Sequence, residues 1–139
     1  MKTNLFPLLF LASCAQAHTA IDAGNVALEW HTDTNERLQV DGDTTLTVTL
    51  KVAGKPLDAA QCRCTLLLYP GAVSPRVRPT VLKTQTDEGG NLNTVITVSK
   101  AGAYALVLDG KPLKPNEFVP FRTVLNLTAL DDVYNGAKP

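Results

Sequence analysis

The chain has 139 residues, 45% of them hydrophobic, and its 13 lysines and arginines are balanced by 13 aspartates and glutamates. A net charge near zero offers no basic field to hold nucleic acid or an anionic membrane, so neither is an expected partner. The length allows one domain with a substantial core and is too short for two.

The first seventeen residues have the layout of a secretory signal peptide. Lys2 supplies a positive charge, an apolar run covers residues 5–12, and small residues follow between 13 and 17. The apolar run is too short to cross a bilayer as a helix. We therefore expect residues 1–17 to be a signal peptide and the protein to be exported.

Two overlapping cleavage sites are present in this segment. Residues 11–14 (Leu-Ala-Ser-Cys) resemble the bacterial lipobox, in which Cys14 receives the lipid. Residues 15–17 (Ala-Gln-Ala) fit the ordinary secretory site, with the mature chain starting at His18. Four consecutive matches favour the lipoprotein, and the free periplasmic protein is the alternative. The lipid anchor would be the protein's contact with the membrane.

Alternation of apolar and polar residues predicts strands along the remaining chain. In residues 45–52, Leu46, Val48 and Leu50 share one face and threonines occupy the other. The other predicted strands cover 26–31, 62–69, 81–86, 92–99, 103–109 and 121–129. Turn signals rich in Gly, Pro, Asn and Asp separate these runs. The pattern predicts an all-β fold, a single antiparallel Ig-like β-sandwich of about seven strands over residues 18–130, followed by a flexible tail over 131–139.

Three turn motifs carry a family resemblance. Residues 54–60 (Gly-Lys-Pro-Leu-Asp-Ala-Ala) are similar to a hinge between two strands of exported Ig-like modules. Residues 86–91 (Thr-Asp-Glu-Gly-Gly-Asn) resemble their turn, and residues 101–106 (Ala-Gly-Ala-Tyr-Ala-Leu) resemble the entry to a late strand. Their order, over about residues 41–110, resembles prealbumin-like and YtkA-like bacterial domains. The resemblance implies the architecture and no particular activity, because unrelated functions share this fold.

Cys62 and Cys64 share one face of a predicted strand. In a regular strand their Cβ atoms would be about 7 Å apart, beyond the roughly 3.5–4.5 Å of a disulfide. A disulfide would then require a bulge or a break, so we expect two small buried thiols. The alternative is a thiolate pair that binds copper(I) or zinc, because unpaired thiols are unusual in exported proteins.

His18 and His31 are the two histidines. If the mature chain starts at His18, its α-amino group and imidazole form a chelate for copper(II), and His31 is a candidate second ligand on the polar face of its strand. This arrangement resembles CopC-type copper proteins, which use an N-terminal histidine on an Ig-like sandwich. The chain lacks their Met-rich copper(I) segment, since its methionine is Met1. A solvated histidine is the simpler expectation.

The longest irregular stretch, residues 69–79, is rich in proline and carries Arg76 and Arg78, with Arg63 and Lys83 expected nearby. Loops of this kind often bind ligands, so the two arginines are candidates for an anionic ligand or a partner protein. A solvated loop is the alternative.

The sequence contains no recognised catalytic motif: it has no Gly-flanked nucleophilic serine, no His-rich zinc triad and no phosphate-binding glycine loop. We therefore predict a non-enzymatic binding or accessory module of the cell envelope, without a resident cofactor, whose partner is an unidentified envelope protein. The alternative function is periplasmic copper binding or copper delivery.

Overall fold

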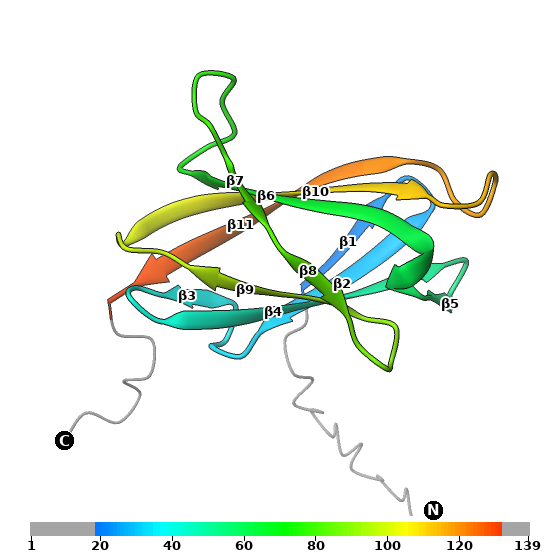
Figure 1. Ribbon diagram of the computed structural model, residues 1–139, viewed down its shortest axis with the longest axis horizontal. Helices are drawn as coiled ribbons and strands as arrows, with labels where there is room; N and C mark the ends of the chain where they lie inside the picture. Colours follow the sequence, from blue (N-terminus) through cyan, green and yellow to red (C-terminus); the bar gives the residue numbers. More distant parts are fainter. Residues whose placement is uncertain (1–18, 132–139) are drawn as a thin grey trace, which may run out of the picture.

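The alternating segments of the sequence form two β-sheets that pack face to face in the computed structural model (Figure 1). The structure describes residues 19–131. The elements of this part are β1 (Thr19–Ala23), β2 (Val26–Thr32), β3 (Arg37–Gln39), β4 (Asp43–Val52), β5 (Lys55–Leu57), the 3-10 helix η1 (Ala59–Gln61), β6 (Cys62–Pro70), β7 (Thr80–Leu82), β8 (Thr84–Thr86), β9 (Leu92–Thr97), β10 (Gly102–Pro112) and β11 (Phe121–Leu130). Among residues 19–131 there is no helix with the length and apolar character needed to span a bilayer.

Sheet A has the strand order β1-β2-β4-β9-β8, with β5 also paired to β4, and sheet B has the order β3-β11-β10-β6-β7. Neighbouring strands are antiparallel, with one exception in sheet B, where β3 runs parallel to β11. This arrangement confirms the predicted Ig-like β-sandwich.

Three of the observed strands lie outside the predicted set. Strands β3 and β5 have three residues each, too few for an alternating pattern to be recognised. Strand β1 precedes the first predicted strand and pairs with it as a hairpin. The predicted strand over residues 81–86 is divided between β7 in sheet B and β8 in sheet A. The tail expected over 131–139 lies outside the described residues from position 132 onward.

The core lies between the two sheets and is built by their alternating faces. Leu46, Val48 and Leu50 of β4 are at most 1% exposed, and so are Leu106 and Leu108 of β10. Complete burial of each such side chain contributes about 1.5–3 kcal/mol relative to an exposed one. The predicted inward face of β4 is therefore confirmed, and Thr45, Thr47 and Thr49 lie on the outer side.

Two of the motifs found in the sequence have clear structural roles. Tyr104 packs its ring against the core and donates its hydroxyl to the carbonyl oxygen of Lys100, at 2.8 Å. In the β8–β9 turn, the carboxylate of Asp87 accepts hydrogen bonds from the Asn93 side chain and the Asn91 backbone, both at 2.9 Å. Those bonds lower the pKa of Asp87, so their contribution is present near neutral pH and is lost as pH falls through the lowered pKa.

Gly110 provides the space for a large aromatic side chain. It is paired with Phe121 on one side and with Cys64 on the other. A Cβ at this position would lie 2.3 Å from Phe121 Cε1 and 2.4 Å from its Cζ. The Phe121 ring is buried beside that of Phe118, with the two centroids 5.9 Å apart, so it has little room to move.

We expect Gly110→Ala to lower the free energy of unfolding by about 1–3 kcal/mol, the usual cost of overpacking a well-filled core. Urea denaturation followed by circular dichroism measures it. Gly89→Ala is the matched control, because its added Cβ meets the half-buried Asn91 and the exposed Asp87 side chains at 3.3 Å, outside the core. Equal stability of the two variants would contradict this account of Gly110.

Candidate functional site

One chain segment forms an edge of both sheets. Strand β7 pairs with β6 at the edge of sheet B, and after Lys83 the chain continues as β8, which pairs with β9 at the edge of sheet A. In Figure 1 this segment is the green ribbon that crosses in front of the molecule from one sheet to the other. The crossing explains why residues 81–86 have a continuous alternating pattern and yet form two strands.

A buried hydrogen bond holds the crossing in place. The Thr94 hydroxyl, on a residue that is 4% exposed, donates to the carbonyl oxygen of Lys83 at 2.7 Å. Lys83 lies between β7 and β8, at the point where the chain changes sheet. The threonine hydroxyl gives its carbonyl oxygen a buried side-chain donor at that point.

The crossing leaves part of β9 open. Strand β8 pairs with Leu92–Thr94, and no described strand pairs with the same side of residues 95–97, whose other side pairs with β4. We call residues 95–97 the open edge of β9. Unpaired strand edges present backbone N–H and C=O groups that can pair with another extended chain.

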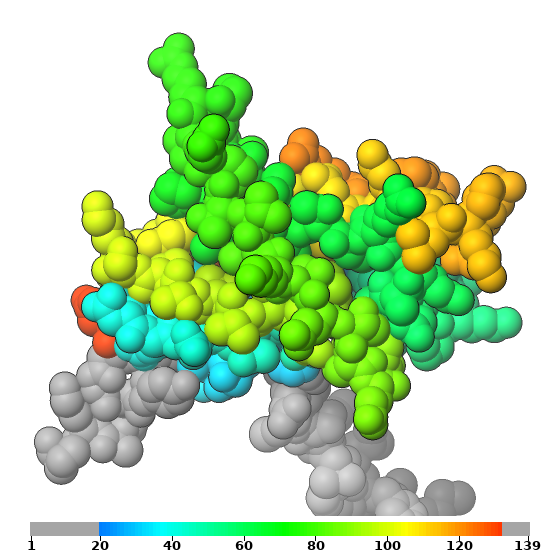
Figure 2. All heavy atoms as spheres, viewed as in Figure 1, coloured from blue at the N-terminus to red at the C-terminus, as the bar shows by residue number. Residues whose placement is uncertain are grey.

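Two hollows lie along the open edge. A groove of about 450 Å³ is lined by Thr45, Val81, Leu82, Lys83, Gln85, Asn93, Thr94 and Val95. A smaller hollow of about 200 Å³ is lined by Leu68, Pro70, Thr80, Thr97, Val98, Ser99 and Tyr104. Val81 and Val95 of the larger groove are 67% and 53% exposed. Figure 2 shows the crossing segment in green beside the yellow-green of β9 on this face of the molecule. These valines offer apolar surface to a ligand in the groove.

The crossing segment and the loop before it carry positive charge. Between Asp58 and Asp87 the sequence contains no acidic residue, whereas Arg76, Arg78 and Lys83 are exposed there. At the far end of the open edge, the Asp43 carboxylate of β4 accepts a hydrogen bond from the Thr97 hydroxyl. Arg63 does not join the three cations: it lies near the start of β6, about 20 Å along the strand from the loop. Arg63 and the loop are close in the sequence, which is why we expected them to be neighbours. In the structure, the extended strand β6 separates them.

The loop that carries Arg76 and Arg78 projects from the sandwich and is anchored at its base (Figure 1). Val77 packs against a second apolar cluster formed by Tyr69, Ala105 and Val107 on the outer face of sheet B. The Ser74 hydroxyl accepts from the backbone N–H of Arg76 at 3.2 Å, which shapes the turn. The alternation rule assigns Val107 to the outer face, so the sequence does not reveal that a loop buries it.

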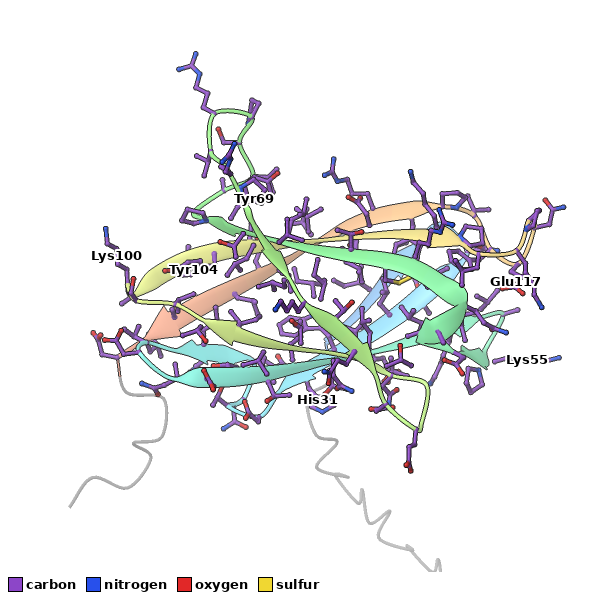
Figure 3. All side chains as sticks on the ribbon, viewed as in Figure 1. His31, Lys55, Tyr69, Lys100, Tyr104 and Glu117 are labelled. Carbon is purple, nitrogen blue, oxygen red and sulfur yellow. A yellow bond between two sulfur atoms is a disulfide. The ribbon has the colours of Figure 1, made fainter. Side chains whose placement is uncertain are left out.

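Cys62 and Cys64 form a disulfide, which corrects the expectation of two free thiols (the yellow bond in Figure 3). Their Cα atoms are 5.2 Å apart, compared with about 6.6 Å for two residues of a regular strand. The register with β10 continues from Cys62 to Pro70 without an inserted residue, so the strand contains no bulge here. Local contraction of the backbone brings the two sulfurs together. As expected, both cysteines face the core, and both are partly buried.

The disulfide adds little to the stability of the fold. Cross-linking residues two apart removes a very small loop from the unfolded ensemble, worth about 1.6 kcal/mol in the chain-entropy description. Both cysteines also belong to one strand, so the bond joins no two elements.

The predicted metal ligands are dispersed. His31 is exposed on β2 of sheet A, and Figure 3 shows it on the side of that sheet away from sheet B. Cys62 and Cys64 belong to sheet B, and a disulfide has no thiolate to offer a metal. Cys14 and His18 lie outside the described residues. From residue 19 to residue 131, no three His, Cys, Asp or Glu residues form a group that could hold a metal ion.

No known family model matches the chain, and no curated protein is significantly similar to it in sequence. Solved structures are similar in fold. A DUF4426 family protein from Pseudomonas aeruginosa has a TM-score of 0.56 at 11% identity, over 82% of this chain and 98% of that one. A DUF4785 family protein from Legionella pneumophila has a TM-score of 0.55 at 14% identity, over 76% of this chain and 29% of that one. FetP of a uropathogenic E. coli strain, produced in the periplasm, has a TM-score of 0.51 at 10% identity, over 81% and 93%.

These likenesses show the fold of the protein, an Ig-like β-sandwich. At such low identity the shared feature is the fold, and a fold of this kind carries many unrelated functions.

We expect Thr94→Val to lower the free energy of unfolding by about 1 kcal/mol, because one buried hydrogen bond to the Lys83 carbonyl would be lost. Hydrogen exchange should also become faster in β8. Thr97→Val is the control, since its hydroxyl bonds to the exposed side chain of Asp43. Equal exchange rates in the two variants would show that the Thr94 hydrogen bond does not hold the crossing.

Proposed function

We propose that this protein is an exported, non-enzymatic module that binds an extended segment of a partner protein along the open edge of β9. The observation that carries the proposal is the unpaired stretch of residues 95–97, bordered by a groove that contains two exposed valines. Export is supported by the signal-like residues 1–17. An envelope protein would be the natural partner.

A short extended segment of a partner protein could be added to sheet A as a further strand at the open edge of β9. An extended segment would occupy the position in sheet A that β8 leaves free after Thr94, and its backbone would pair with β9. Backbone hydrogen bonds would provide affinity, and alternate side chains of the segment would enter the groove beside Val81 and Val95. Those two valines would then be removed from water.

The charge of the surroundings suggests the composition of the bound segment. Lys83, which lines the groove, and Arg76 and Arg78 of the loop before it would attract acidic side chains at the end of the edge nearer β8, away from Asp43. We therefore expect an alternating apolar and acidic sequence. Complementary charge of this kind raises association rates and selects among partners, and its effect falls with salt.

Edge protection is the competing explanation of the same residues. Lysine and proline at sheet edges discourage unwanted pairing, and Lys83 and Pro79 fit that role. A protected edge would be covered by polar or charged side chains. The exposed valines at positions 81 and 95 therefore favour a binding edge.

The test is to select short random peptides on the protein and measure their affinity by calorimetry. We expect alternating apolar and acidic peptides, whose binding Val95→Lys weakens by about tenfold or more, because the contact with one exposed valine is lost and a hydrated charge is introduced. Val124→Lys is the matched control: Val124 is 41% exposed on sheet B, away from the groove. Selection of no peptide, or of peptides that bind both variants equally, would refute the proposal.

A second candidate function is copper binding, and the pairing of β1 with β2 is the observation that favours it. Thr19 is opposite Trp30 in the antiparallel register, and His31 follows Trp30. The start of β1, one residue after His18 in the sequence, therefore lies beside the end of β2 that carries His31. Neighbouring strands bring side chains close enough to share a ligand. The resemblance of the predicted N-terminal histidine site to that of CopC-type proteins supports this second candidate function.

For this candidate, we expect a chain that starts at His18 to bind one copper(II) tightly, and His31→Ala to weaken binding by about tenfold, the effect of losing one ligand or its support. Titration against a competing chelator measures both affinities. Thr47→Ala, which changes the residue opposite His31, is the control. Affinity in the millimolar range, or equal affinity of the two variants, would exclude the site.

A further inference from the structure

We propose that the Cys62–Cys64 disulfide is a thiol–disulfide exchange site that accepts electrons from cysteine pairs of extended or unfolded polypeptides. This inference is independent of the proposed binding edge. It rests on where the disulfide lies in the fold, which charges surround it and which surface is next to it.

The position of the disulfide is unlike that of a structural cross-link. Both cysteines lie on β6, where Cys62 is already paired with Pro112 and Cys64 with Gly110 of β10. The ladder with β10 continues along the whole of β6, so the strand stays in the sheet whether or not the sulfurs are bonded. Reduction can therefore occur without unfolding, as a reversible redox couple requires.

Two cations lie on the same stretch of the sheet as the bond. Arg63 stands between the cysteines in the sequence and Lys111 is paired with it across the ladder; both are exposed, on the face of sheet B opposite the one that carries Cys62 and Cys64. Positive charge near a cysteine favours the thiolate, which makes the sulfur a better leaving group and stabilises the reduced pair. The same charges attract an incoming substrate thiolate. Both cysteines pack against the margin of the core and keep part of their surface exposed.

An apolar hollow lies at the same end of the sandwich. It has a volume of about 440 Å³, and its lining residues are Asn25, Pro112, Pro115, Asn116, Phe118, Val119 and Pro120. Pro112 is the residue opposite Cys62, so this surface begins next to the disulfide. Leu113 and Val119 are 51% and 56% exposed beside it. Apolar side chains that flank the cysteines of an unfolded polypeptide fit such a surface.

The exchange takes place in two displacements. A substrate thiolate attacks one sulfur of the Cys62–Cys64 bond, which breaks as a mixed disulfide forms and the other cysteine leaves as a thiolate. The second substrate thiolate then attacks the substrate sulfur of the mixed disulfide. The substrate leaves as a disulfide, and Cys62 and Cys64 have gained its two electrons and take up protons from water.

The experiment uses protein with Cys14→Ser, so that Cys62 and Cys64 alone can react. Native protein is incubated with reduced glutathione, and separately with a synthetic apolar peptide that contains two cysteines; free thiols are trapped by alkylation and counted by mass spectrometry. We expect reduction of Cys62–Cys64 with circular dichroism unchanged, and one peptide disulfide formed for each protein disulfide lost. A peptide with serines in place of cysteines should give no reaction.

Charge variants separate an active site from accidental reactivity. We expect Arg63→Glu together with Lys111→Glu to slow the reaction by about fivefold or more, because an anionic thiolate would meet negative charge. Lys100→Glu, at the opposite end of the sandwich in Figure 3, should leave the rate unchanged. A disulfide that resists both thiols until the protein is denatured would overturn the proposal, as would equal slowing by the two sets of charge changes.

Discussion

The apolar layer between the two sheets is the constraint from which the other features of this protein follow. Leu46 and Leu50 on β4 face Leu106 and Leu108 on β10, and none of them is more than 1% exposed. Because burial of these inward faces stabilises the sandwich, the sheets must stay face to face along their length. Any functional surface is then confined to the outer faces, the sheet edges and the loops.

Closing one side of the sandwich with a single segment has a geometric consequence. Strand β7 covers part of β6, and β8 covers Leu92–Thr94 of β9. A chain that crosses from one sheet to the other cannot continue along either edge, so a stretch of each sheet is left without a neighbour. The open edge of β9 and the groove beside it arise from this crossing, and Thr94 stabilises it from within.

How much of the protein could be predicted depends on the range of the interactions involved. The long strands follow from alternation, and the turn at Asp87 and the bonded hydroxyl of Tyr104 follow from local motifs. The division of residues 81–86 between two sheets could not be predicted, since the alternating pattern is the same in either sheet. The Cys62–Cys64 bond was missed for another reason: regular strand geometry excludes it, and a local contraction to 5.2 Å between Cα atoms permits it.

The sequence by itself determined the class of fold, the inward face of each long strand and the signal-like character of residues 1–17. These properties depend on periods of two residues and on short motifs, which are complete within a few positions of the chain. Tertiary structure decided which edge stays open, which loop covers Val107, and that Arg63 lies apart from Arg76 and Arg78. Each of these depends on contacts between residues far apart in the chain. Such contacts are fixed by how the two sheets pack, and the same alternating pattern is compatible with more than one packing.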